Sequence, residues 1–325
     1  MDKLGFGERA REPDRTPPHL RLGLALIEAD RPEEARLALQ GASAVALRGH
    51  GPTSDPLYHW ALACSSWLVG RWDEALIEVE QGLAAAESRA MTVHGAPMAG
   101  VGIMVAVHRD DLAGGWRLLE RVQQRFAARS VSDLWFRGAE ALLVEAEGRP
   151  QVALDLLADA WDQARPFTHA SADRVFGPAL VRLALRSPDC ELARSVADEV
   201  AIRAQELAGA GPRGAALRCL GMFDEDAALL EEAVATLRPA GRPFEFAGAC
   251  EQASAWLARA GARQRSQSLF AHALTAYRSL GAARDIERML AGRARWGEAI
   301  PLAHHRRAER QPAVAARTRL QPSAW

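Results

Sequence analysis

The feature that most constrains the fold of this chain is a short pattern that recurs about every 40 residues. Each copy is a small turn, then acidic or polar residues, then a small residue that opens a helix. The successive spacings are 40, 40, 38, 40, 34 and 39 residues. A period in this range predicts an array of similar units that pack on one another. The clear copies end at Ala35, Ala75, Gly115, Ala153 and Ala193, and the weaker copies end at Ala227 and Ser266.

Each unit has the pattern of two helices, most clearly in the second copy. Between Trp72 and Ala86, apolar residues recur at the 3.6-residue spacing of a helix, and acidic residues occupy the other positions. The preceding stretch, "DPLYHWALACSSWLVG", predicts the partner helix. Asp55 can cap that helix, Pro56 fits its first position, and Gly70 can end it in the left-handed conformation.

The fold class follows from the absence of a second pattern. No stretch alternates apolar and polar residues over a useful length, as a half-buried strand would. The sequence therefore predicts an all-α protein, a right-handed α-solenoid of about seven helix pairs over residues 18–292. We expect residues 1–17 to form a disordered N-terminal segment and residues 293–325 to form a basic, disordered tail.

The array resembles tetratricopeptide repeats, although its period exceeds the usual length of about 34 residues. In that repeat, one small residue in each helix allows the two helices to approach, and a bulky apolar residue fills the gap between pairs. Longer helices of this kind are typical of the repeat region in large bacterial regulators. The resemblance groups Gly23 with Ala35, Leu39 and Ala42, Ala63 with Ala75 and Val79, Ala141 with Ala153, Leu157 and Ala160, and Ser266 with Phe270 and Ala273.

Residues 227–290 resemble the last repeats of LuxR-type, MalT-like ATP-binding transcriptional regulators. The resemblance rests on "LLEEAVATL", "GRPFEFAGACE", "LARAGAR" and "ALTAYRSLGAARD", in that order. In that family an ATPase is followed by a helical repeat region and then by a helix-turn-helix that reads DNA. The resemblance implies that this chain corresponds to the repeat region, which binds the inducer, holds the regulator inactive and contributes to self-association.

The sequence shows neither of the other two parts of such a regulator. A P-loop needs a lysine to reach the phosphates, and Lys3 is the only lysine in the sequence. After Leu290 we find no convincing pair of helices and no room for the DNA reader. We therefore expect no direct sequence-specific DNA binding by this chain.

Three interpretations of the tail stay open. Between Arg293 and Trp325 there are seven arginines against Glu298 and Glu309. This segment is a disordered tail, a segment that touches phosphates non-specifically, or the product of a frame shift or truncation in a regulator gene. An intact in-frame stop codon, with no DNA reader encoded beyond it in any frame, would exclude the last interpretation.

Composition and the lack of targeting segments limit the partners and the cellular compartment that we expect for this chain. The net charge of −1 gives no bulk attraction to nucleic acid or to an anionic membrane. The four cysteines form no CxxC pair, which favours buried or half-buried free thiols. The N-terminus lacks the apolar stretch of a signal peptide, and the longest apolar run, residues 96–107, is too short to cross a bilayer. These features predict a soluble, cytoplasmic protein without membrane contact.

The candidate site lies on the inner surface of the array, which the first helices of the pairs would line. Tryptophans beside an arginine and a carboxylate suit a peptide or a small effector. The alternative is that Trp60 and Trp67 pack against the neighbouring unit, because tryptophan also fills helical cores. The candidate ligand-binding residues are Leu57, Trp60, Trp67, Trp135, Glu145 and Arg182.

No local motif indicates catalysis, a cofactor or a metal. HExxH, GxSxG and GxGxxG do not occur, and the single lysine leaves no candidate for a Schiff base within the array. We expect a non-catalytic chain with no cofactor and no metal. A pocket that gathers residues from different repeats would not be visible at this level.

Two functions remain open. The first is a non-catalytic binding or sensor module of a LuxR/MalT-like regulator, whose partner is a full-length regulator or a second copy and which also binds a small-molecule effector. The second is a free-standing tetratricopeptide scaffold with no link to transcription. A reading frame for a P-loop ATPase directly upstream of the gene would favour the first.

Overall fold

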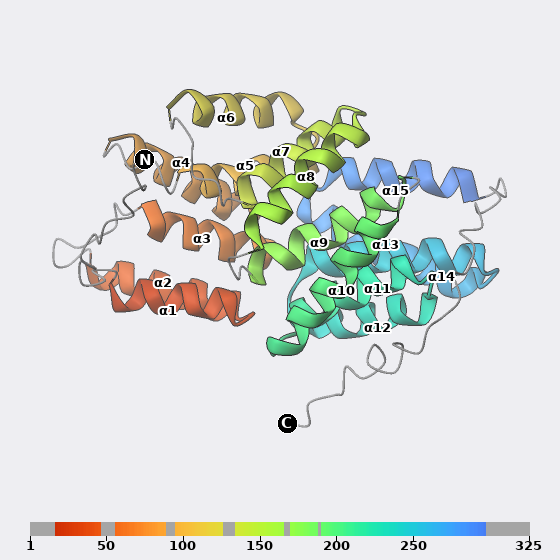
Figure 1. Cartoon of the computed structure of the whole chain (residues 1–325). Helices are drawn as coiled ribbons and strands as arrows, with labels where there is room; N and C mark the ends of the chain where they lie inside the picture. Colours follow the sequence, from red (N-terminus) through yellow and green to blue (C-terminus); the bar gives the residue numbers. More distant parts are fainter. Residues whose placement is uncertain are drawn as a thin grey trace, which may run out of the picture.

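The computed structural model describes residues 17–46, 56–88, 95–125, 134–165, 170–187 and 190–296. Within these ranges every regular element is a helix (Figure 1). The all-α prediction is therefore confirmed for this part of the chain. In the described part of the chain, seven helix pairs are followed by one last helix. The pairs are α1 (Pro18–Glu28) with α2 (Pro32–Ala46), α3 (Pro56–Leu68) with α4 (Trp72–Ser88), α5 (Gly95–His108) with α6 (Leu112–Arg125), α7 (Leu134–Ala146) with α8 (Pro150–Ala164), α9 (Ala170–Ala184) with α10 (Glu191–Glu206), α11 (Ala210–Phe223) with α12 (Ala227–Leu237) and α13 (Pro243–Arg259) with α14 (Arg263–Leu280), and the last helix is α15 (Ala283–Trp296). A short 3-10 turn, η2 (Arg238–Ala240), follows α12.

The recurring sequence pattern opens the second helix of each pair, as predicted. Its small residues lie in the core, where Ala35, Ala75, Ala153 and Ala193 are fully buried. The grouping within the first pair is confirmed by Gly23, because a Cβ atom there would lie 2.7 Å from Leu39 Cγ. A side chain at that position would push the two helices apart, so glycine permits their close packing.

The sixth copy of the pattern was placed three residues too early. Ala227 is the first residue of α12 and is partly exposed, whereas Leu230 is fully buried. A Cβ atom on Gly221 of the preceding helix would lie 2.8 Å from Leu230 Cγ. The small residue therefore stands in the first helix of this pair and the large one in the second. This exchange hid the register from a search for a small residue.

The turn inside most pairs contains one residue with positive φ. Gly70, at +81°, ends α3 as predicted, and Gly148 and Gly261 serve the same purpose. Asp30 and Asp110 take this conformation at +62° and +65°. Aspartate tolerates it better than most residues, but glycine is the default. Their carboxylates have distant partners, which gives these two turns a further role.

The two ends of the array also touch each other. Beyond contacts between successive pairs, α1 contacts α9 and α5 contacts α15. The Glu28 carboxylate accepts a hydrogen bond from the Ser171 hydroxyl at 2.7 Å. In Figure 1, α1 to α5 lie on one side of the molecule, α11 to α15 lie on the other, and α7 and α8 lie between them. This departs from the expected array, in which a unit touches only its neighbours.

We use the name seam for the contact between the turns at Asp30, Gly70 and Asp110 and the helices α9, α11, α13 and α15. At the middle turn, a Cβ atom on Gly70 would lie 2.5 Å from Cγ of Pro243, the first residue of α13. The left-handed turn therefore also needs glycine for space. The seam joins elements that are far apart along the chain.

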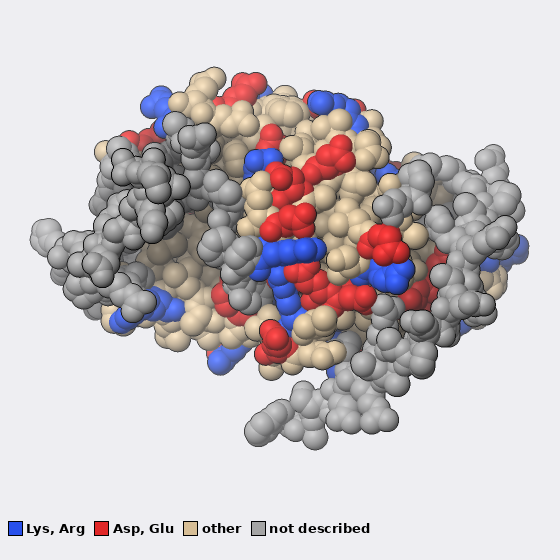
Figure 2. Space-filling view, viewed as in Figure 1, with Lys and Arg blue, Asp and Glu red and all other residues tan. Residues whose placement is uncertain are grey.

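Several predictions concern residues outside the described ranges, namely the cap Asp55, residues 1–16 and residues 297–325. The last helix continues to Trp296, past the predicted boundary at 292. No helix in the described ranges has both the length and the apolar character needed to cross a membrane. Figure 2 shows a band of mixed acidic and basic side chains over α8, α9 and α10. Between α9 and α10, Arg203 pairs with Asp173 and Glu199.

Candidate binding site

Asp30 anchors the first end of the seam. Its carboxylate accepts a hydrogen bond from the Gly211 backbone N–H at 2.7 Å, so it caps α11 from the other end of the array. The same carboxylate pairs with Arg242, and with Arg174 at 3.1 Å. Cβ atoms on Gly209 and Gly211 would lie within 2.6 Å of Asp30. Both glycines are therefore needed for Asp30 to approach.

Glu245 completes a buried group that we call the Asp30 cluster, with Asp30, Arg174 and Arg242. The two arginine side chains are 1% exposed and Glu245 is 6% exposed. Glu245 lies 3.8 Å from Arg174 Nε and 3.7 Å from Arg242 Nε, which is too long for hydrogen bonds. Burial raises the pKa of Glu245, and the two arginines oppose that rise. This cluster holds charge in the interior without pairing all of it closely.

An aromatic group occupies the middle of the seam. Phe244 lies at the start of α13. The centroid of its ring lies 5.8 Å from that of Trp67, 5.7 Å from that of Trp72 and 4.3 Å from that of His108. The ring centroid of Tyr277 in α14 also lies 5.9 Å from that of Phe244. These tilted contacts are favourable geometries for aromatic rings. The two ends of the array thus share apolar packing as well as charge.

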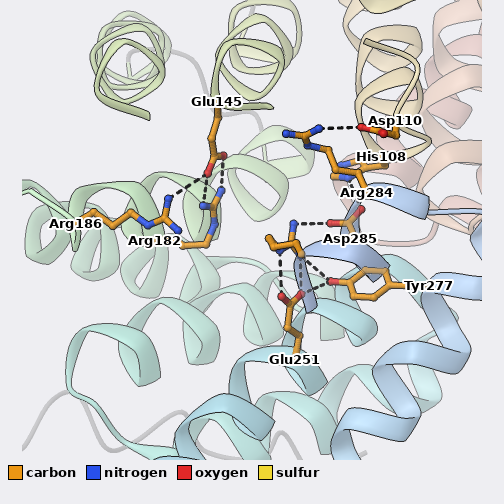
Figure 3. A network of polar contacts seen from close by, with 10 residues as sticks. His108, Asp110, Glu145, Arg182, Arg186, Glu251, Tyr277, Arg284 and Asp285 are labelled. Atoms are coloured by element: carbon orange, nitrogen blue, oxygen red, sulfur yellow. Dashed lines mark hydrogen bonds and ion pairs between the residues drawn. The ribbon is translucent and has the colours of Figure 1, made fainter. Parts of the chain in front are cut away.

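His108 and Asp285 form the second end of the seam. The His108 ring lies 2.8 Å from the Asp285 carboxylate, and Arg288 donates to the same carboxylate at 2.7 Å (Figure 3). Burial raises the pKa of Asp285, but His108 and Arg288 outweigh it and hold this pKa well below its usual range. The ionised form is therefore strongly favoured in the folded protein.

Glu251 extends this group on α13. Arg288 donates to both oxygens of Glu251, at 3.1 and 2.6 Å, and the Tyr277 hydroxyl donates at 2.8 Å. Burial and the nearby Glu251 carboxylate raise the pKa of Tyr277 well above its usual value. We call His108, Asp285, Arg288, Glu251 and Tyr277 the Asp285 network. Its carboxylates each accept at least two hydrogen bonds.

The left-handed turn at Asp110 joins the same end of the seam. The Asp110 carboxylate pairs with Arg284 at 2.8 Å, and Arg284 also donates to the Ala146 carbonyl. Arg284 precedes Asp285 at the start of α15, so one short segment binds two turns of the array. Figure 3 shows this contact beside the His108 pair.

Two of the predicted site residues form a pair of their own. Arg182 donates to both oxygens of Glu145 at 2.5 and 2.6 Å, and Arg186 lies 3.8 Å from the same carboxylate. Burial raises the pKa of Glu145, but Arg182 outweighs it and the net shift is downward. Figure 3 places this pair near the Asp285 network, although it comes from α7 and α9. The structure therefore brings Glu145 and Arg182 together.

Among the other four predicted residues, Trp67 and Trp135 lie deeper. Trp67 and Trp135 are 1% and 4% exposed, and their rings meet edge to face at 5.9 Å. Leu57 and Trp60 are partly buried and pack against the core. Trp67 is thus a core residue, in line with the alternative interpretation, which named Trp60 and Trp67. Ligand contact at any of the six residues stays a prediction.

The charged residues of the seam were not predicted. Asp30 and Asp110 did carry a signal, because they occupy the turn position that is glycine in three other pairs. The glycines of "AGAGP", residues 208–212, carried another, since they clear the space for Asp30. Neither signal names a partner, and the partners come from the opposite end of the array.

The carboxylates of the seam and of the Glu145 pair each face an arginine or a histidine. Such an arrangement suits holding two surfaces together or recognising a charged group. Among the described residues, no group of three metal-ligating side chains converges on one point. The cysteine prediction is confirmed in its structural part, since Cys64, Cys219 and Cys250 are buried and Cys190 is partly buried.

Comparison with known proteins adds no assignment. The sequence matches no family model and no curated protein.

Proposed function

We propose that this chain is the binding or sensor module of a LuxR/MalT-like transcriptional regulator, built as a right-handed tetratricopeptide-like α-solenoid. Its role is non-catalytic. It binds a small effector on its inner surface and contacts a full-length regulator or a second copy of itself.

The observation that carries the proposal is the polar seam between the ends of the array. Inter-domain contacts of mixed polar and apolar character resemble transient interfaces more than permanent cores. At its Asp30 end, the seam holds ion pairs that a charged ligand or a partner surface can replace. A contact that exchanges partners is what a sensor module requires.

The link to transcription rests on the resemblance of residues 227–290. The segment "GRPFEFAGACE" supplies Arg242, Phe244, Glu245 and Glu251 to the seam, and "ALTAYRSLGAARD" supplies Tyr277, Arg284 and Asp285. The motifs that suggested the regulator family are therefore also the ones that close the array. This agreement favours a regulator module over a free-standing scaffold.

Capture from the cells that produce the protein tests this proposal. The purified chain serves as bait beside the seam variant Asp30→Ala and the exposed-site control Arg117→Met. We expect the bait to retain a protein that carries both a P-loop ATPase and a helix-turn-helix, or a second copy of itself, and the seam variant to change the retained amount. Retention of neither by the wild-type bait would contradict the proposal.

Immunoblotting of the same cells with an antibody against the repeats separates the two forms of the hypothesis. A band near 35.2 kDa means that the array acts as a separate chain. A much larger band means that it is one part of a regulator.

A further inference from the structure

Arg218 of α11 differs from the other arginines of the interior. It is partly exposed, and its Nε donates to the Gln252 side-chain oxygen at 2.8 Å. No carboxylate of the described residues lies within 4.0 Å of its guanidinium. By contrast, Arg174, Arg242 and Arg288 each face at least one carboxylate within that distance. The two terminal nitrogens of Arg218 are therefore not engaged by a protein anion.

The position of this guanidinium is set by α13. A Cβ atom on Gly248 would lie 2.7 Å from Arg218 Nη2 and 3.2 Å from its Cζ, so the absent side chain makes the room. Gln252, one turn further along α13, holds Nε and is itself held by Met222 Sδ at 3.1 Å. The terminal Nη1–Nη2 edge is therefore the part left for another partner.

The nearby carboxylates do not satisfy Arg218, because they serve other cations. Glu251 is bound by Arg288 and Tyr277, and Glu245 faces Arg174 and Arg242. Burial lowers the pKa of Arg218, while Tyr277, Cys219, Glu245 and Glu251 oppose that shift. An arginine stays charged even so, and a charge that is largely removed from water and lacks a close partner is costly.

We propose that Arg218 is the receptor for a small oxyanion, the carboxylate or phosphate of the effector. The planar Nη1–Nη2 edge matches two oxygens of such a group. Gly248 and Gln252 hold that edge in place before the anion arrives. Less ordering is then needed on binding.

The inference rests on the proposed function, because it names the chemical class of the effector. Anion binding is measured on the purified chain, whereas the link to a regulator is measured by capture. Failure of one measurement is thus distinguishable from failure of the other.

The experiment compares Arg218→Met with the control Arg278→Met, an exposed arginine of α14. Thermal unfolding is followed with sodium succinate or inorganic phosphate as probes, against sodium chloride at the same ionic strength. We expect at least one probe to raise the Tm of the wild type and of the control. In Arg218→Met we expect a higher Tm without probe and an affinity for the probe lower by about ten-fold or more. The probe that acts identifies the anion.

Two results would overturn the inference. One is a probe effect that is absent from the wild type or equal in Arg218→Met, since the anion would then bind elsewhere or not at all. The other is a Tm of Arg218→Met below that of Arg278→Met without probe, which would make Arg218 a stabilising residue. Arg218→Lys keeps the charge but loses the two-pronged edge, and we expect it to fold and to bind the probe less tightly than the wild type does.

Discussion

The Asp30 cluster and the Asp285 network both close the array, yet their buried carboxylates differ in how closely they are paired. In the Asp285 network, Asp285 and Glu251 each accept hydrogen bonds from two side chains. In the Asp30 cluster, Glu245 accepts none from the described residues, and its two arginines stay at 3.7 and 3.8 Å. Arg218 adds a third guanidinium on that side of α13.

This difference indicates which end of the seam can change its contacts. A closely paired network holds one geometry, because each partner limits the others. A loosely paired buried cluster costs free energy until a further partner or a shift of the helices satisfies it. We therefore infer that the Asp30 end responds to a ligand and that the Asp285 end acts as the fixed joint.

The largest effect is expected from Asp30→Ala. The change leaves Arg174 and Arg242 buried with only Glu245 and removes the cap of α11, and breaking a buried pair costs about 3–5 kcal/mol of unfolding free energy. Urea denaturation measures this loss. Asp226→Ala is the matched control, because Asp226 caps α12 locally and its loss costs about 1 kcal/mol. Equal losses in the two variants would show that Asp30 is only a cap.

The second prediction concerns how stability depends on pH. We expect Asp285 at one end of the seam and Glu245 at the other to act in opposite directions. The pKa of Asp285 is lowered by folding, so this residue stabilises the protein above its unfolded pKa of about 3.9 and less as pH falls below that value. The pKa of Glu245 is raised by folding, so the wild type loses stability as pH rises through about 4.3. Each unit of pKa difference corresponds to about 1.4 kcal/mol.

The free energy of unfolding of Asp285→Asn and Glu245→Gln, measured by denaturation at several pH values between about 3 and 7, checks both directions. Carboxyl groups titrate in this range. As pH rises, Asp285→Asn is expected to lose stability relative to the wild type, and Glu245→Gln is expected to gain. Each variant is the control for the other. Shifts in the same direction would remove the distinction between the two ends.

A smaller effect is expected from Arg182→Met. The pair with Glu145 is close, but the two side chains are 29% and 19% exposed, so solvent screens the interaction. We expect a loss below about 1 kcal/mol in urea denaturation. Arg137→Met, which removes a longer surface pair with Asp159, is the control. A loss as large as that of Asp30→Ala would extend the fixed joint to α7 and α9.

The last test measures how fast the structure opens locally around Cys64. Cys64 is fully buried near Arg174 and Arg242, and burial raises the pKa of its thiol to about 12. A buried thiol reacts only when the structure around it opens. In a chain that keeps Cys64 as its single cysteine, we expect a thiol reagent to label it about ten-fold faster or more after Asp30→Ala.

Asp285→Asn in the same single-cysteine chain is the control for this labelling. We expect it to change the rate less, because Cys64 reports on the Asp30 end. A faster rate in Asp285→Asn than in Asp30→Ala would reverse the assignment of the two ends.

The sequence by itself determined the helix pairs. The 3.6-residue apolar period, the turn at Gly70 and the contact of Gly23 with Leu39 depend on residues close in the chain, so their pattern is visible in one unit and repeats in the next. Glu145 and Arg182 were named from their repeat positions for the same reason, since they stand 37 residues apart, about one period. The register of α12 was missed because Gly221 and Leu230 exchange the usual sizes.

Only the tertiary structure decided that the array closes. Asp30 and Gly211 are 181 residues apart, and His108 and Asp285 are 177 apart. Whether such residues meet depends on the small rotation between neighbouring pairs, summed over the whole array. No single unit encodes that sum, because a change of a few degrees in each pair leaves every local contact intact and moves the ends of the array apart.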